Sequence, residues 1–292
     1  MAAETVGQTT LRAENVNKTV TGFALQSYVA KQVVMSNSSS AWVETYFKES
    51  KADLTASGTR AVKGIPRLAK FPYGEVSWTK ASSYLEKYGM EGVVSWEDAI
   101  TDNVDVIART LLRIARAVVK AVDTQIWSAL TENYTPSTIN TLALATGYEW
   151  DSATIANRDP IQDILNAIKL IAEDNYDAIS GEGFIAIPPK AFANLLGNAS
   201  VRNAGQFYTS DVTRNGRVGR ICGLNMLVSN SITADKAIVG VGKICGTWKE
   251  AVPLTVVTIP DPGVNYTIRA WEIGVCQLTN PEAICLITNT DA

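Results

Sequence analysis

One long amphipathic segment restricts what this chain can fold into more than any other feature. From residue 97 to residue 130, apolar side chains recur at intervals of three and four, which places them along one face of an α-helix. These positions are Val104, Ile107, Leu111, Ile114, Val118, Val122 and Ile126. At about 1.5 Å per residue the predicted helix is roughly 45–50 Å long, which is more than most small domains need.

The charges on this helix are separated by sign. The acids Glu97, Asp98, Asp102 and Asp105 lie in its first half, and the cations Arg109, Arg113, Arg116 and Lys120 lie in its second half. This order complements the helix dipole. Asp105 and Arg109 are also spaced for a weak i,i+4 pair. We interpret the four cations as a solvated face of the helix.

The chain before this helix lacks the apolar content for a core of its own. Residues 1 to about 40 form a polar arm, in which only a short segment near Phe23, Leu25, Tyr28 and Val29 is able to pack. An arm of this kind rarely folds by itself and more often lies on something else, such as a neighbouring subunit.

A basic loop follows the arm. Residues 54–74 contain no acid, but they contain the cations Arg60, Lys63, Arg67 and Lys70. Glycines and prolines interrupt this stretch and argue against a helix. Residues 75–80 alternate as a strand does, and residues 83–94 could supply a partner strand or a connector. The pattern predicts a long, extended hairpin.

The remainder of the chain predicts an α+β protein. Asp159 and Pro160 suit the N-cap and the first position of a second helix. A strand at 184–187, a short helix at 191–196 and a polar loop at 197–219 come next. The last part is mostly β, with strands expected at 220–229, 237–241, 254–259, 266–278 and 283–288.

Composition narrows the function classes. The chain of 292 residues has a net charge of −3 and no histidine. The missing histidines exclude histidine-dependent nucleophiles and H-E-x-x-H zinc sites. The four cysteines contain no C-x-x-C spacing, so we expect reduced, buried thiols and no metal. No stretch approaches the ~20 apolar residues of a membrane span, and the start has no signal-peptide layout, so we expect a soluble protein without a membrane partner.

The order of parts, namely arm, basic hairpin, long helix, α/β region and terminal strands, resembles the major capsid protein of tailed bacteriophages. Encapsulin shells use the same fold. The stretches that carry the resemblance are V-S-W-E-D-A-I-T-D at 94–102, F-I-A-I-P-P-K-A-F at 184–192, G-R-I-C-G-L-N-M-L-V-S-N at 219–230, A-I-V-G at 237–240 and N-P-E-A-I at 280–284. Each stretch alone is only weakly similar to the family, and the resemblance rests on the shared order of the stretches along the chain.

The resemblance implies a phage major-capsid fold with four parts. These are an N-terminal arm at 1–45, an extended β-hairpin loop at 46–97, a peripheral domain with the spine helix at 98–154 and 251–292, and an axial α/β domain at 155–250. The arm follows Met1 directly, so we expect no cleaved scaffolding segment in the chain, and either a separate scaffold protein or none.

The resemblance also implies a structural function without catalytic residues or cofactors. We expect hexamers and pentamers that form an icosahedral shell around double-stranded DNA, in a virion assembled in the host cytoplasm. A portal protein is an expected partner, and scaffold or decoration proteins are further candidates. The near-neutral charge implies that DNA is contained without sequence readout, and that binding by a free subunit is weak and salt-dependent.

The candidate contact residues between subunits are chosen by charge. Arg60, Lys63, Arg67 and Lys70 of the basic loop are expected to meet Asp102 and Asp105 of a neighbouring copy. A solvated loop is the plain alternative. At the level of function, two alternatives stay open: an encapsulin-like cellular compartment, and an α+β enzyme that uses carboxylate or lysine chemistry.

Overall fold

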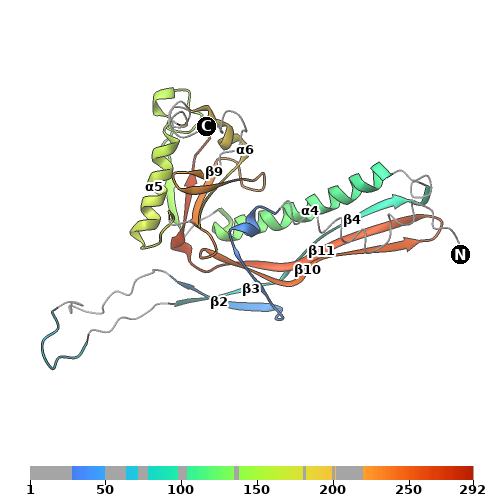
Figure 1. Cartoon of the computed structure of the whole chain (residues 1–292), viewed down its shortest axis with the longest axis horizontal. Helices are drawn as coiled ribbons and strands as arrows, with labels where there is room; N and C mark the ends of the chain where they lie inside the picture. The colour runs from blue at the N-terminus through green and yellow to red at the C-terminus, as the bar shows by residue number, and fades with distance from the viewer. Residues whose placement is uncertain are drawn as a thin grey trace. The chain divides into compact units, whose positions relative to one another are not determined.

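The computed structural model describes residues 28–49, 64–71, 78–97, 104–134, 138–179, 182–198, 201 and 220–291 (Figure 1). The chain divides into two compact units, each assembled from separated segments. Unit 1 consists of Met1–Glu44, Ser83–Ala129 and Trp248–Gln277, and unit 2 of Thr45–Ser82, Leu130–Thr247 and Leu278–Ala292. The predicted α+β class is confirmed.

Unit 1 is a four-stranded sheet covered by one long helix. The strand order is β1-β10-β11-β4. The strands are β1 (Met35–Ser38), β4 (Glu86–Ser95), β10 (Gly246–Asp261) and β11 (Asn265–Leu278), and the 3-10 helix η1 (Ala30–Gln32) precedes β1. The predicted turn between the two long strands is present, with a hydrogen bond of 3.0 Å from the Val264 N–H to the Asp261 carbonyl oxygen.

The long predicted helix is α4 (Val104–Leu130), which runs along the strands in Figure 1. Its predicted apolar face is buried at Leu111, Ile114, Val118, Val122 and Ile126. Residues 98–103, which belong to the predicted start of the helix, lie outside the described residues.

Gly92 of β4 allows α4 to approach the sheet closely. A Cβ atom at this position would lie 2.5 Å from Ile114 Cδ1 and 2.8 Å from Thr110 Cγ2. Such separations are far inside van der Waals contact, so a larger residue would force the side chains of Ile114 and Thr110 to move.

The two strands that follow the basic loop do not pair with each other as the predicted hairpin of neighbouring segments would. β3 (Trp78–Tyr84) pairs with β2 (Val43–Glu49) in a two-stranded sheet. β4 instead pairs antiparallel with β11, from Glu86 opposite Gly274 to Ser95 opposite Asn265. Residues 83–94 therefore extend the main sheet of unit 1, because their apolar positions find partners more than a hundred residues away in sequence.

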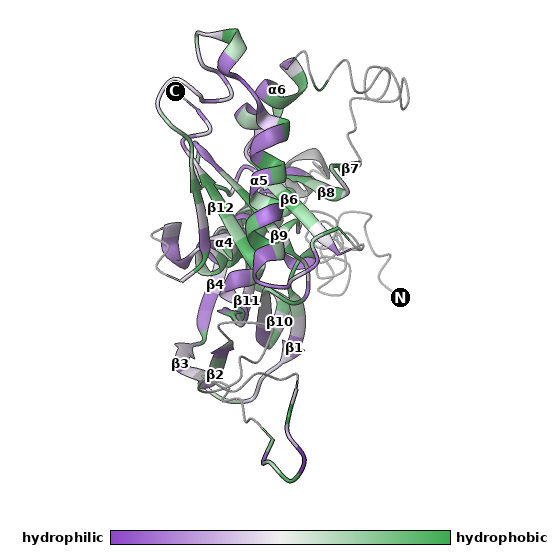
Figure 2. Ribbon diagram, turned by 90° about the vertical axis from the view of Figure 1, so that its left-hand side faces the viewer, coloured by the Kyte–Doolittle hydropathy of each residue, from purple (hydrophilic) through white to green (hydrophobic). Residues whose placement is uncertain are grey.

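Unit 2 contains a mixed six-stranded sheet in the order β5-β12-β9-β6-β8-β7. Its strands are β5 (Asn140–Ala143), β6 (Gly183–Ile187), β7 (Arg220–Ile221), β8 (Leu224–Val228), β9 (Lys236–Val241) and β12 (Ile284–Thr288). Every residue of β6 is buried, and Figure 2 draws the central strands in the green of hydrophobic residues. The single strand predicted at 220–229 is two short strands, because Cys222 and Gly223 both adopt positive φ and form a turn.

Helices and short 3-10 turns accompany the sheet in the described part of unit 2. The helices are α5 (Pro160–Glu173) and α6 (Pro189–Gly197), and the turns are η2 (Glu132–Tyr134), η3 (Ile155–Asn157) and η4 (Pro281–Ala283). The predicted N-cap of α5 is confirmed, since the Asp159 carboxylate accepts a hydrogen bond from the Gln162 N–H at 3.2 Å. The helix buries Ile164, Ile168 and Ile171.

Candidate inter-subunit contacts

The tip of the basic loop presents apolar and cationic side chains to solvent. Residues 64–71 include a turn in which the Ala69 N–H donates to the Pro66 carbonyl oxygen at 3.1 Å. Leu68 adopts a φ of +64° and is fully exposed, and Phe71 is 80% exposed. Arg67 and Lys70 are exposed as well. Two large apolar side chains exposed so close together make this loop a candidate surface for contact with another molecule.

The structure locates some of the candidate contact residues chosen by charge. Arg67 and Lys70 lie in this loop tip, and Asp105 lies in α4. Arg60, Lys63 and Asp102 lie outside the described residues. A contact between copies is not contained in a single chain, so these pairings stay predictions.

Sequence reasoning named the cations of the loop but missed Leu68 and Phe71. A signal for them was present, because both are large apolar residues in a stretch whose glycines and prolines deny it a core. Leu68 and Phe71 are therefore added to the candidate contact residues.

A second set of contacts fixes the segment Tyr28–Val34 within unit 1. The Asp123 carboxylate of α4 accepts hydrogen bonds from the N–H groups of Val29 and Ala30, at 3.1 and 3.2 Å. These groups belong to the N-cap and the first residue of η1, so Asp123 acts as a cap supplied by another helix. Asp123 is only 3% exposed, and its burial raises the pKa of the carboxyl group to about 6 in spite of the two hydrogen bonds.

Glu272 of β11 holds the same segment through the side chains of Tyr28 and Lys31. It is fully buried, accepts a hydrogen bond from the Tyr28 hydroxyl at 2.6 Å and forms an ion pair with Lys31. The Lys31 ammonium also lies 4.1 Å from the ring centre of Tyr28 and 5.3 Å from that of Trp248. Burial raises the pKa of the Tyr28 hydroxyl, as does its negatively charged neighbour Glu272. The segment predicted to pack near Tyr28 is thus a docked part of unit 1.

A charged group in unit 2 connects α6 to the last described residues. The Lys190 ammonium lies 2.9 Å from Asp151 and 3.6 Å from Asp291. Asn194 donates to Asp291 at 3.3 Å, and the Asp291 N–H donates to Asp235 at 3.1 Å. Each contact joins one part of the chain to another, so the group serves the fold. Within the residues that the structure describes, no group of three or more acids and cysteines is arranged to hold a metal ion.

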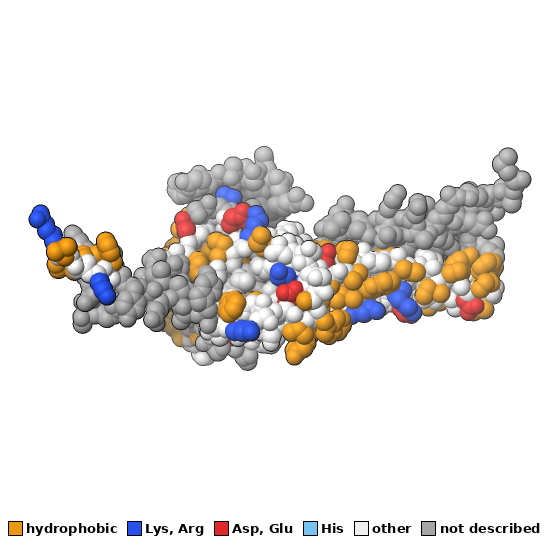
Figure 3. All heavy atoms as spheres, turned by 90° about the horizontal axis from the view of Figure 1, so that it is seen from below, with side chains coloured by type: hydrophobic (Ala, Val, Ile, Leu, Met, Phe, Trp, Pro, Cys, Tyr) orange, Lys and Arg blue, Asp and Glu red, His pale blue; other side chains and the backbone are white. Residues whose placement is uncertain are grey.

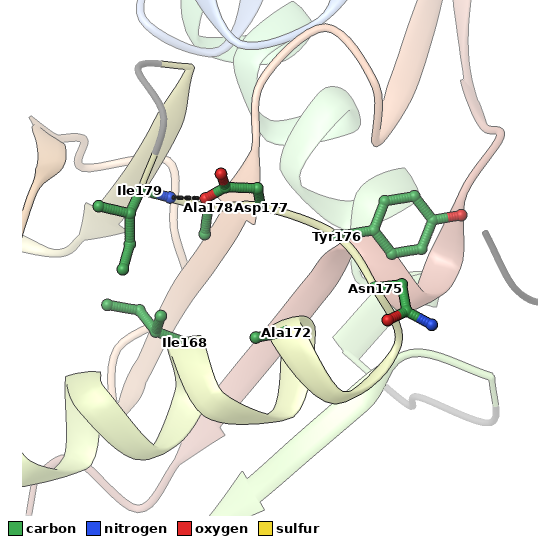
Figure 4. Close-up of a pocket in the computed structure, with 7 residues that line it drawn as sticks. All are labelled: Ile168, Ala172, Asn175, Tyr176, Asp177, Ala178 and Ile179. Carbon is green, nitrogen blue, oxygen red and sulfur yellow. Dashed lines mark hydrogen bonds between the residues drawn. The ribbon is translucent and has the colours of Figure 1, made fainter. Parts of the chain in front are cut away.

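A shallow, mostly apolar hollow of about 260 Å³ lies beside the end of α5 (Figure 4). It is lined by Ile168, Ala172, Asn175, Tyr176, Asp177, Ala178 and Ile179. The Asp177 carboxylate accepts a hydrogen bond from the Ile179 N–H at 2.8 Å and so stabilises the turn. The lining contains one carboxylate, that of Asp177.

The cysteines are free, and three of them are buried. Burial raises the pKa of Cys245 and of Cys285 to about 12, so both stay as inert thiols. Cys222 is partly exposed, which differs from the buried environment expected for all four. No helix among the described residues is both long and apolar enough to cross a bilayer.

Comparison with solved structures defines the class of fold. The protein of a virus-like particle from Pyrococcus furiosus is 14% identical with a TM-score of 0.63, over 94% of this chain and 98% of that one. A protein of Mycobacterium phage Che8 is 16% identical with a TM-score of 0.64, over 91% and 92%. The capsid of cyanophage P-SCSP1u is 11% identical with a TM-score of 0.65, over 91% and 89%. The fold is that of phage capsid proteins, as the sequence predicts.

A family model described as phage capsid protein matches residues 80–287. The match covers well over half of the chain, so the chain belongs to the phage capsid protein family. It is a structural protein of the virion, with the role of a major capsid protein. The search of curated proteins found no match.

Proposed function

We propose that copies of this chain assemble as hexamers and pentamers into an icosahedral shell that encloses double-stranded DNA without reading its sequence. The observation that carries the proposal is the loop tip at 64–71, where Leu68 and Phe71 are exposed beside two cations. A family of shell proteins supplies the reason for such a surface, since each copy has a neighbour to cover it.

The loop tip supports a contact with two components. Burying a large apolar side chain contributes about 1.5–3 kcal/mol, so Leu68 and Phe71 are the stronger candidates for anchors. Exposed ion pairs contribute only about 0–1 kcal/mol each. We assign a second role to the cations of the loop, which is to orient the loop against acids of the neighbouring copy. The cations are Arg60, Lys63, Arg67 and Lys70, and the proposed acids are Asp102 and Asp105.

The proposed organisation follows the parts expected from the sequence. An arm at 1–45 and an extended loop at 46–97 make contacts between copies, apart from the docked segment Tyr28–Val34 and strand β4, which belong to the body of unit 1. A peripheral domain at 98–154 and 251–292 and an axial domain at 155–250 form the body. The shell assembles in the host cytoplasm, without catalysis by this chain. A portal protein, and a separate scaffold or decoration protein, are the proposed further partners.

Purification followed by size-exclusion chromatography and negative-stain microscopy tests the assembly. The expected result is closed particles or capsomers of uniform size. A stable monomer under all conditions tested, without large particles, would contradict the proposal.

Charge reversal tests the contact. Changing Arg60, Lys63, Arg67 and Lys70 together to Glu is expected to leave folded subunits or capsomers that fail to close, with partial rescue by high salt because salt screens the new repulsion. Normal yields of normal shells would show that the loop's charge is not an assembly contact.

An encapsulin-like compartment is the second candidate, and it is favoured by one observation, the fold shared with the virus-like particle from Pyrococcus furiosus. The contents of native particles distinguish the two. Packaged genomic DNA supports the phage capsid, and an enclosed cargo enzyme supports the compartment.

A further inference from the structure

One face of α4 carries four exposed cations, Arg109, Arg113, Arg116 and Lys120, which we name the basic stripe. They follow one another at intervals of four, three and four residues, so they share one side of the helix. At ~1.5 Å per residue the stripe is about 16 Å long.

The basic stripe points away from the core of unit 1. The opposite side of α4 packs Ile114, Val118 and Val122 into the interior, and Gly92 allows the helix to lie directly on β4. The far face of the sheet is different in character, since it exposes hydrophobic side chains such as Val93, Val257 and Ile259 (Figure 3). The stripe is therefore a distinct surface of the unit.

No acid on the same stretch of helix neutralises the stripe. From residue 109 to residue 130, the only acid in the sequence is Asp123. Asp123 is 3% exposed and bonded to the backbone of Val29 and Ala30. Among the residues that the structure describes, none of the four cations of the stripe has an ion-pair partner.

Several other exposed cations of the chain are paired. Lys169 lies 3.4 Å from Glu173, Lys243 lies 2.8 Å from Glu182, and Arg269 lies 2.5 Å from Glu91. Four consecutive unpaired cations are therefore a concentrated positive surface on a chain whose net charge is −3. A surface of this kind attracts an extended polyanion.

We propose that the basic stripe binds the phosphate backbone of the double-stranded DNA enclosed by the shell. The proposal rests on the proposed function and adds the surface that touches the DNA. Three of the four cations are arginines, whose planar guanidinium groups bind phosphate oxygens in pairs. Duplex DNA carries about one negative charge per 1.7 Å, so a stripe of this length faces enough phosphates for every cation.

The stripe binds DNA weakly in a single copy, with a dissociation constant on the order of 10⁻⁴ to 10⁻⁶ M, as non-specific contacts do. Each phosphate contact adds about 0.9 to the slope of log affinity against log salt. Repetition over the shell makes the summed attraction large, while each contact stays easy to exchange.

The first test measures binding of the full-length chain, as dissociated capsomers, to a short fluorescent duplex between about 50 and 200 mM salt. The double variant R113Q/R116Q is expected to lower the salt slope by about two. The matched control K169Q/K243Q makes the same change in net charge elsewhere and is expected to leave the slope unchanged. An unchanged slope in R113Q/R116Q, or an equal loss in both variants, overturns the proposal.

The second test needs no variant. An amine-reactive label is applied to intact particles with and without DNA, and labelling of Lys120 is compared with that of Lys169 by mass spectrometry. We expect DNA to protect Lys120 and not Lys169. Equal labelling of Lys120 in both kinds of particle overturns the proposal.

Microscopy of the same preparations separates this proposal from the proposed function. If the wild-type chain forms no particles, the proposed function fails. If R113Q/R116Q loses its particles while its DNA affinity is unchanged, the stripe contacts an acidic surface of another copy, and only the DNA proposal fails.

Discussion

The Asp123 carboxylate accepts hydrogen bonds from the backbone N–H groups of both Val29 and Ala30, and so joins two parts of the chain more than 90 residues apart. This cap predicts a specific loss of stability. Replacing Asp123 by Ala leaves two N–H groups without their acceptor in a buried place, which costs about 1–3 kcal/mol. Chemical denaturation of the unassembled chain measures the loss, and a change below about 0.5 kcal/mol would contradict the assignment.

The raised pKa of Asp123 predicts how stability depends on pH. The pKa is about 6 in the folded chain and 3.8 for an ordinary Asp, so the folded state binds this proton more tightly. The contribution of Asp123 to stability is therefore greatest below about pH 4 and is lost as the pH rises through about 6. Its size is on the order of 2–3 kcal/mol.

Replacing Asp123 by Asn removes the titrating group and isolates this contribution. The difference in unfolding free energy between wild type and variant is expected to shift in favour of wild type as the pH falls from 7 to 5. A difference that is independent of pH, or that shifts in the opposite direction, is incompatible with the raised pKa.

The ion pair between the partly exposed Lys31 and the buried Glu272 predicts strong coupling. Changing Lys31 to Met leaves the carboxylate of Glu272 buried without its cation, which costs about 3–5 kcal/mol. The double variant K31M/E272Q removes the uncompensated charge as well and is expected to recover part of that loss. A double-mutant cycle measured by denaturation checks this, and additive effects of the two changes would count against the pair.

The exposed apolar residues of the loop tip predict an assembly defect without a folding defect. Changing Leu68 and Phe71 together to Ala is expected to leave the unfolding transition of the subunit unchanged, because both are exposed in the single chain. Particle yield is expected to fall at least tenfold, since each truncated anchor costs more than about 1 kcal/mol at the interface. The variant R67A/K70A, in the same loop, separates the contribution of the apolar side chains from that of the charges. Normal particle yields of L68A/F71A would show that Leu68 and Phe71 are not part of the contact.

The close approach at Gly92 predicts that even a methyl group is harmful there. Changing Gly92 to Ala places a Cβ atom 2.5 Å from Ile114 Cδ1, and the overpacking is expected to cost about 1–3 kcal/mol. Gly197 is the matched control, because a Cβ atom there meets nothing within 4 Å. Equal stability of the two variants would show that the side chains of Ile114 and Thr110 can repack around the new methyl group without penalty.

Features set by neighbouring residues could be predicted from the sequence. The N-cap Asp159 and the following Pro160 fixed the start of α5, and the three- and four-residue spacing fixed the buried face of α4. Both signals act within one or two turns of helix, so they can be seen without a three-dimensional structure.

Features that depend on distant partners could not be predicted. Tyr28 and Glu272 are 244 positions apart, and nothing in either local pattern indicates that one donates to the other. For the same reason, β4 could not be assigned to β11. In the loop, attention to the charges of Arg67 and Lys70 hid the apolar pair Leu68 and Phe71 beside them, although the glycines and prolines of this stretch already deny it a core in which the pair could be buried.

The position of β12 in the sheet of unit 2 has a consequence for synthesis of the protein. β12 comprises Ile284–Thr288, yet it lies between β5 and β9 and pairs with both. The ribosome therefore has to complete nearly all of the described chain before this sheet can close, and a chain interrupted before residue 284 exposes the facing edges of two strands. A chain interrupted there therefore lacks a finished sheet in unit 2 and leaves strand edges open to pairing with other chains.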